Sequence, residues 1–142
     1  MSVCVDASVL IRWLVPQQSD PRVYKLVDGW IEDEVELVGP ALLFSEVVSV
    51  LRHQAHKGIL HSEDADRIVW LFLRLGIRRI DNFTLYRRAF ELATHFGHTR
   101  AYDAHYLAAA EQEGCHLWTA DGPLYESVRR ELRWVKHVSR RP

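Results

Sequence analysis

The hydrophobic residues of this chain alternate between short unbroken runs and stretches at helical spacing. Val3 to Val5 form a short apolar run, which is typical of a strand covered on both faces of a parallel sheet. The run ends at Asp6 and Ser8, and the apolar residues of 9–14 then fall on one side of a helix. A carboxylate between a strand and a helix is where α/β proteins often place their chemistry.

The same pattern continues to the end of the chain. It predicts strands at 3–5, 36–40, 77–80, 116–119 and 134–138, with the second broken by a turn at its Gly-Pro end. It predicts helices over 9–15, 21–31, 41–57, 62–75, 84–96, 103–113 and 124–132, and a loose tail over 140–142. This alternation predicts an α/β sandwich around a mainly parallel sheet of four to five strands.

Composition limits the classes of protein to consider. A chain of 142 residues with 48% hydrophobic and 26% charged residues fits one globular domain. The formal net charge of -1 excludes a general polyanion-binding surface, so any contact with nucleic acid needs local basic patches. Cys4 and Cys115 lie beside apolar runs, which suggests buried free thiols in a reducing compartment. Asp6 and Arg12 interrupt the N-terminal run, so we expect neither a signal peptide nor a membrane span, and a cytoplasmic protein.

Four acidic residues stand where chemistry could occur. Asp6 and Asp121 each follow a predicted strand, Asp103 opens a predicted helix, and Glu46 shares a helical face with apolar residues. Each has an ordinary explanation when taken alone. Asp6 and Asp121 could be helix N-caps, Asp103 could complement a helix dipole, and Glu46 could reach solvent from the edge of its apolar stripe.

Taken together, the four acids predict a metal site. The carboxyl ends of parallel strands open on one edge of a sheet, so Asp6 and Asp121 should face a common crevice that Asp103 and Glu46 can reach. Four converging carboxylates need a counter-charge, and an all-oxygen site suits Mg²⁺ or Mn²⁺ better than Zn²⁺. Ser8 and Thr119 could orient these carboxylates. Such a site would position a water molecule against a phosphodiester.

Four stretches of the sequence resemble the PIN domain family, and more closely its VapC toxins. They are Val5-Asp6-Ala7-Ser8-Val9, the 40–47 stretch around Glu46, the 102–108 stretch around Asp103, and Leu117-Trp118-Thr119-Ala120-Asp121. They occur in the family's order and span nearly the whole chain. Relatives often carry Asn three residues after the conserved Glu, where this chain has Ser49.

The resemblance implies a function as well as a fold. It implies a three-layer α/β/α domain over 1–142 and a magnesium- or manganese-dependent endoribonuclease, the toxin of a toxin–antitoxin pair. It implies that Asp6, Glu46, Asp103 and Asp121 are the catalytic acids and metal ligands, with Ser8 and Thr119 in support. It also implies a homodimer inhibited by a small VapB-type antitoxin. Two alternatives stay open: an RNA-processing or decay nuclease outside a toxin pair, and a non-catalytic RNA-binding scaffold. A phosphoryl-transfer protein is disfavoured, because no lysine follows a candidate strand.

Several basic residues, two histidine pairs and one apolar stretch lie outside these motifs. Arg52, His53, Lys57 and Arg100 could track an RNA backbone, although ordinary surface charge would also explain them. The His53/His56 and His95/His98 pairs lack a third ligand, so we expect helix-face or capping histidines. Residues 68–73 are apolar all round, which indicates either a dimer interface or deep burial.

Overall fold

One sheet of five strands, all parallel, forms the centre of the molecule in the order β3-β2-β1-β4-β5. The computed structural model describes residues 1–140; the last two residues of the predicted tail, Arg141 and Pro142, lie outside the described residues. The strands are β1 (Ser2–Val5), β2 (Glu36–Pro40), β3 (Arg78–Ile80), β4 (His116–Thr119) and β5 (Val135–His137). The predicted α/β class with a parallel sheet is confirmed.

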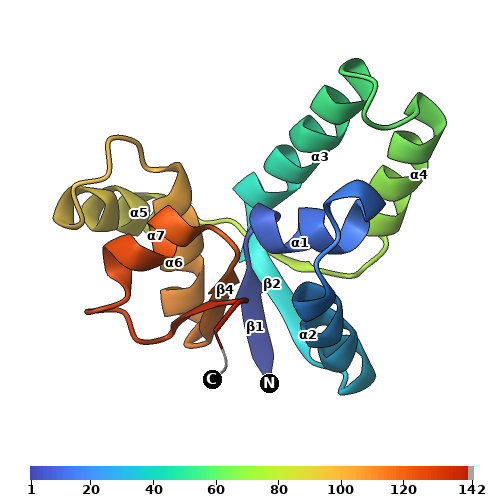
Figure 1. The fold of residues 1–142 in the computed structure, drawn as a ribbon. Helices are drawn as coiled ribbons and strands as arrows, with labels where there is room; N and C mark the ends of the chain where they lie inside the picture. Colours follow the sequence, from blue (N-terminus) through green and yellow to red (C-terminus); the bar gives the residue numbers. More distant parts are fainter. Residues whose placement is uncertain (141–142) are drawn as a thin grey trace.

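Helices cover both faces of the sheet. They are α1 (Ala7–Leu14), α2 (Pro21–Glu32), α3 (Ala41–His56), α4 (Ser62–Leu73), α5 (Phe83–His95), α6 (Tyr102–Glu113) and α7 (Gly122–Val128). Figure 1 shows α1 and α2 on one side of the strands and α5, α6 and α7 on the other. Helix α6 packs on β1, β2 and β4. Its residues 106–110 are buried, so this helix forms much of the core on that side of the sheet.

The order of the strands creates a crevice at the middle of the sheet. The chain moves outward from β1 to β2 and β3, then crosses back to β4 and β5 on the other side of β1. Because parallel crossovers are right-handed, this reversal sends the first helices to one face and the later helices to the other. The connections that follow β1 and β4 therefore leave toward opposite faces of the sheet, and a crevice opens between them at the carboxyl ends of the two strands. Open α/β sheets bind ligands at this place.

The predicted break in the second strand is wrong. β2 runs without interruption to Pro40, which pairs in register with Ile80. Gly39 is there for close packing, because a Cβ at this position would come within 2.6 Å of the Leu43 side chain. Proline is tolerated because it is the last residue of the strand and directly precedes α3.

The other differences between the predicted and the observed structure lie at the ends of helices and strands. α7 runs from Gly122 to Val128, so it starts earlier and stops earlier than predicted, because Asp121 caps its N-terminus and Pro123 occupies its first turn. A short 3₁₀ turn at Pro16–Gln18 links α1 to α2. The remaining boundaries agree with the prediction to within two residues.

Both cysteines are free thiols, as predicted, although only Cys4 is fully buried and Cys115 is half-buried. Across residues 1–140, none of the helices combines the length and the apolar character needed to cross a membrane.

Candidate active site

Asp6 lies at the centre of the crevice, directly after β1. It is buried, and its backbone N–H donates to the carbonyl of Trp118 on the neighbouring strand, 3.3 Å away. Its Oδ1 accepts from the Val9 N–H at 3.2 Å, so Asp6 is the N-cap of α1 as well as a candidate site residue. Oδ1 also accepts from the Ser8 hydroxyl, and Oδ2 accepts from the Thr119 hydroxyl. These three bonds hold the carboxylate in one orientation.

The hydroxyls of Ser8 and Thr119 tie Asp6 to the turn after β4. Each hydroxyl donates to Asp6 and accepts from a backbone N–H of that turn: Ser8 from Ala120 and Thr119 from Asp121, both at 2.9 Å. Ser8 and Thr119 thus both hydrogen-bond one of the four carboxylates, that of Asp6. A hydroxyl can donate only one proton, so this arrangement commits both hydroxyl protons to Asp6.

Asp121 occupies that turn and faces the same crevice. Its Oδ1 accepts from the Leu124 N–H at 3.0 Å, which makes it the N-cap of α7. Its second carboxylate oxygen accepts no hydrogen bond from residues 1–140. The N-cap explanation is thus correct for both Asp6 and Asp121, and it fixes their carboxylates at the edge of the crevice.

Glu46 and Asp103 approach from flanking helices. Glu46 projects from the second turn of α3, which begins at the end of β2, and it is half-buried. Asp103 is in the first turn of α6, at the more exposed rim of the crevice. Helix α6 therefore presents a carboxylate close to its own N-terminus, where negative charge is favourable.

The electrostatics of the four carboxylates show that they share one environment. Burial raises the pKa of Asp6 from 3.8 to about 6, against the lowering effect of its hydrogen bonds, and nearby Asp121 raises it further. Burial also raises the pKa of Glu46, with added repulsion from Asp103 and Asp6. The pKa of Asp103 is raised by burial and by Asp121, while His98 opposes this change. Each of the four acids is thus within electrostatic reach of two others.

This donor set fits a hard divalent cation. All its ligand atoms are carboxylate oxygens, which suit Mg²⁺ or Mn²⁺. Within residues 1–140, no three Asp, Glu, His or Cys side chains already stand close enough to hold one ion. Four like charges repel each other, so a bound cation would draw these carboxylates together. Asp6 Oδ2 accepts only the Thr119 bond, so it retains room for one further partner.

Tyr106 is a candidate site residue that the sequence reasoning missed. It lies one turn after Asp103 on α6 and is fully buried. Its hydroxyl has no hydrogen-bond partner of normal geometry, yet it lies near enough to Glu46 to lower the pKa of that carboxyl. A buried tyrosine at an apolar helix position looks like core from sequence alone, and only the fold shows the carboxylates around its hydroxyl.

We expect Tyr106→Phe to slow catalysis without loosening the fold. The change removes one oxygen that makes no regular hydrogen bond, so the melting temperature should stay the same or rise slightly. The hydroxyl lowers the pKa of Glu46, so its removal should leave this carboxyl less readily ionised and lower kcat roughly tenfold. The measurement is RNA cleavage and thermal melting beside Tyr24→Phe, a matched change on α2. An unchanged kcat would show that the Tyr106 hydroxyl does not contribute to catalysis and that the side chain only packs in the core.

The predicted RNA-contacting residues fall into two groups. Arg100 lines a small pocket of about 360 Å³ together with His98, Tyr102 and Asp103, so it is adjacent to the crevice. Arg52, His53 and Lys57 are exposed near the far end of α3. His53 and Lys57 share the helical face of Glu46, with His53 about 10 Å further along the axis.

The two histidine pairs have ordinary surroundings. His95 pairs with Glu131 at 2.7 Å, and His98 bonds to the Ser127 hydroxyl at 3.0 Å. His53 and His56 are exposed on the last turns of α3.

Comparison with known proteins decides the family. The sequence profile of the PIN domain matches residues 3–127. This chain belongs to the PIN domain family. It is 37% identical over 119 residues to ribonuclease VapC9 of Mycobacterium tuberculosis, covering 84% of this chain and 85% of that protein.

Solved structures agree on the fold of this PIN domain. The protein PAE2754 of Pyrobaculum aerophilum superposes with a TM-score of 0.72 at 23% identity, covering 98% of this chain and 85% of that one. VapBC2 of Rickettsia felis, bound to a DNA fragment from its promoter, superposes with a TM-score of 0.69 at 11% identity, covering 96% and 97%. The resemblance to PIN domains and VapC proteins inferred from the sequence is confirmed.

Proposed function

We propose that this PIN domain is an endoribonuclease that hydrolyses RNA phosphodiester bonds with the help of Mg²⁺ or Mn²⁺. The observation that supports this most directly is the convergence of Asp6, Glu46, Asp103 and Asp121 on the crevice between β1 and β4. VapC9, its relative over most of the chain, is a ribonuclease.

The four carboxylates would hold the cation, which when bound polarises the phosphoryl group and favours ionisation of a water molecule. The chain's own residues then do the positioning. Ser8 and Thr119 keep Asp6 fixed and ionisable, and the capped turn keeps Asp121 beside it. Water attacks phosphorus, the bond to the leaving ribose oxygen breaks, and that oxygen takes up a proton. The hydroxyls of Ser8 and Thr119 both bond Asp6, and the carboxylates would be taken up by the cation, so we propose direct hydrolysis by water without a covalent intermediate.

We further propose that the protein is the toxin of a toxin–antitoxin pair, inhibited by a small VapB-type protein. VapBC2 of Rickettsia felis, whose toxin shares this fold, was crystallised as such a pair. Since RNA is the substrate, the protein would act in the cytoplasm. A nuclease of RNA processing or decay would share the chemistry but would lack a co-purifying antitoxin.

Cleavage assays test the activity directly. We expect the purified chain to cut single-stranded RNA with added Mg²⁺ or Mn²⁺ and to be inactive in EDTA. Cleavage that persists in EDTA would contradict the metal mechanism. RNA binding with no cleavage under any metal would favour a non-catalytic scaffold.

We also propose a homodimer, for which the structure offers two apolar faces. On α4, Ile68 and Phe72 are buried, whereas Trp70, Leu71 and Leu73 are at least half exposed, so the helix is both core and surface. On α5, Phe83 and Phe90 are exposed as well. Exposed apolar surface that gathers on one helix often marks an interaction site.

Light scattering can test the dimer and locate it. We expect a dimer at micromolar concentration that Trp70→Glu converts to a monomer. Phe90→Glu is the matched change on α5. A wild-type monomer would contradict the dimer, and dissociation by Phe90→Glu alone would move the interface to α5.

A further inference from the structure

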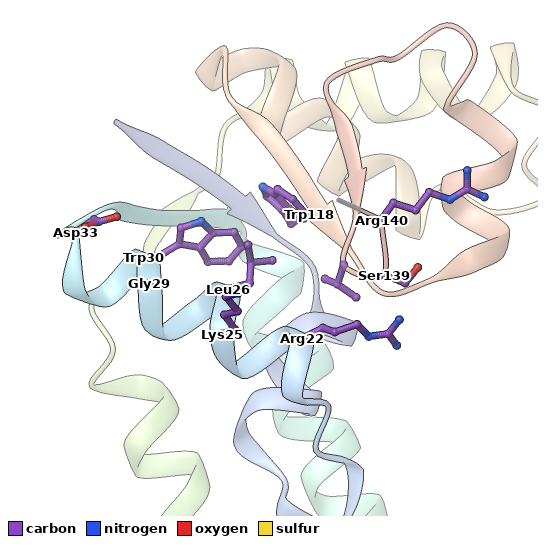
Figure 2. A pocket seen from close by; sticks show the side chains of 10 residues that line it. Arg22, Lys25, Leu26, Gly29, Trp30, Asp33, Trp118, Ser139 and Arg140 are labelled. Atoms are coloured by element: carbon purple, nitrogen blue, oxygen red, sulfur yellow. The ribbon is translucent and has the colours of Figure 1, made fainter. Parts of the chain in front are cut away.

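A groove of about 800 Å³ lies between α2 and the end of β5, outside the carboxylate crevice. Figure 2 shows its walls: α2 on one side, and β4 with the segment after β5 on the other. Trp30, Leu26, Trp118 and Val138 supply its apolar surface. The two indoles meet edge to face, with ring centroids 5.8 Å apart. Trp118 is almost fully buried beneath, while Trp30 is half-buried and keeps part of its ring accessible.

The groove has a basic end and an acidic end. Helix α2 runs back from the carboxyl edge of the sheet, so Arg22 in its first turn lies at that edge and Asp33 at its C-cap lies at the opposite one. Arg140 follows β5 and therefore also lies at the carboxyl edge. In Figure 2, the Arg22 and Arg140 side chains extend from opposite walls at the same end of the groove, far from Asp33. The basic end is thus on the side of the catalytic crevice.

Neighbouring contacts connect this basic end to the crevice. Arg22 forms a two-bond ion pair with Asp20, the N-cap of α2, at 3.1 and 2.9 Å. Arg12 lies near enough to Asp20 to lower the pKa of that carboxyl, and it donates to the Ser8 carbonyl at 2.9 Å. On the other wall, Trp118 directly precedes Thr119, whose hydroxyl bonds Asp6. A polymer lying across Asp6 could therefore continue into the groove.

The cations of the groove retain capacity for a ligand. Arg22 uses two of its five donors on Asp20, and Arg140 bonds Glu126 at 3.1 Å through one nitrogen. These ion pairs fix both guanidinium groups, and that of Arg140 also stacks over the Tyr125 ring of α7, 5.2 Å from its centroid. Lys25, exposed on α2, has no ion pair with residues 1–140.

We propose that this groove binds nucleotides of single-stranded RNA adjacent to the bond being cut, with a base stacked on Trp30 and backbone phosphates at Lys25, Arg22 and Arg140. The inference rests on the proposed ribonuclease activity and adds a substrate subsite to it. Aromatic faces combined with cations are the combination that binds single strands without reading sequence. An acidic crevice repels RNA, so adjacent cations are also needed to hold the substrate. A segment of a partner protein could also occupy this groove, and the experiment below distinguishes a protein partner from RNA.

Two kinds of variant test the groove by separate physical signatures. Trp30→Leu keeps an apolar side chain but removes the stacking face, and we expect KM for a long RNA oligonucleotide to rise roughly tenfold with kcat little changed. The double change Lys25→Gln/Arg140→Gln removes two surface charges. It should also raise KM, and it should flatten the slope of log affinity against log salt by about 0.7 for each phosphate that the protein no longer neutralises. Trp30→Leu should leave that slope unchanged.

Arg87→Gln is the matched control, because it removes an exposed charge from α5 on the other side of the sheet. Its KM should equal that of the wild type.

If the wild type cleaves RNA and both groove variants keep the wild-type KM, the groove proposal is wrong and the ribonuclease proposal stands. If they lose only the binding of a partner protein, the groove is a protein-docking surface and the RNA subsite is wrong. If the wild type neither binds nor cleaves RNA, both proposals fail. Thermal melting shows whether the Trp30→Leu protein is folded. If it is unfolded, the KM and salt dependence of the Lys25→Gln/Arg140→Gln protein test the groove proposal instead.

Discussion

Asp6→Asn should lower RNA cleavage by ~10²-fold or more while leaving the protein folded, because it removes one negative charge from the proposed cation site. Asparagine keeps the shape of the side chain and can still accept the Val9 N–H bond that caps α1. Stability at neutral pH should change little, because the amide nitrogen cannot accept the Thr119 hydroxyl proton, and this loss offsets the relief of a buried charge. A carboxyl whose pKa is raised from 3.8 to about 6 costs about 3 kcal/mol of folding free energy when it is ionised.

The measurement is cleavage and thermal melting of both proteins, with Asp28→Asn as control. Asp28 is an exposed acid on α2 that accepts from the Trp13 indole, and asparagine can accept the same bond. An Asp6→Asn protein of undiminished activity would contradict the metal mechanism. A variant that is inactive only because it unfolds would leave Asp6 with its role as a helix cap.

Divalent metal should stabilise the wild-type protein strongly at neutral pH. Binding at 100 times Kd adds about 2.7 kcal/mol, which corresponds to a rise in Tm of roughly 10 °C for a chain of this size. Asp6→Asn should lose most of this rise. The measurement is melting in EDTA and in Mn²⁺, with Ca²⁺-free buffer in both arms. Equal rises in the two proteins would mean that the metal binds elsewhere.

The metal-free protein should show the opposite sign of pH dependence to most proteins near pH 5. Because the folded pKa of Asp6 is raised, its favourable contribution is complete below the unfolded value of 3.8 and is lost as pH rises through about 6. Glu46 and Asp103 change in the same direction. Asp20, Glu36 and Glu113 act in the opposite sense, because arginines lower their pKa values, but these pairs are exposed and weak. The difference in Tm between Asp6→Asn and wild type in EDTA isolates Asp6, and it should grow as the pH rises from about 4 through about 6.

The placement of the four acids could be predicted from sequence because it follows from topology. Asp6 and Asp121 each end an apolar run, and in a parallel sheet such positions meet at one edge whatever the details of packing. Their capping bonds, which looked like competing explanations, are part of the same geometry, since a carboxylate that caps a helix after a strand necessarily lies at that edge.

Features that depend on packing between distant residues could not be predicted. Gly39 and Pro40 have the composition of a turn, and only their pairing with β3, and for Gly39 the close approach of Leu43, shows that they belong to a strand. Tyr106 occupies an apolar helix position, so its approach to Glu46 is visible only once α3 and α6 are placed around β1. The groove joins α2 to the end of β5 across most of the chain, and no local pattern marks it.

The bond between Thr119 and Asp6 joins residues 113 positions apart. β1 is the central strand of the sheet, and its two neighbours are β2, the next strand along the chain, and β4, which follows only after β3. The entropy of closing so long a loop must be overcome before such contacts contribute, so they slow folding. The crevice cannot form in a fragment that lacks β4, because such a fragment keeps Asp6 but loses the Thr119 hydroxyl that orients it and the Asp121 carboxylate beside it. The four-carboxylate site therefore exists only in a chain that has paired β4 with β1.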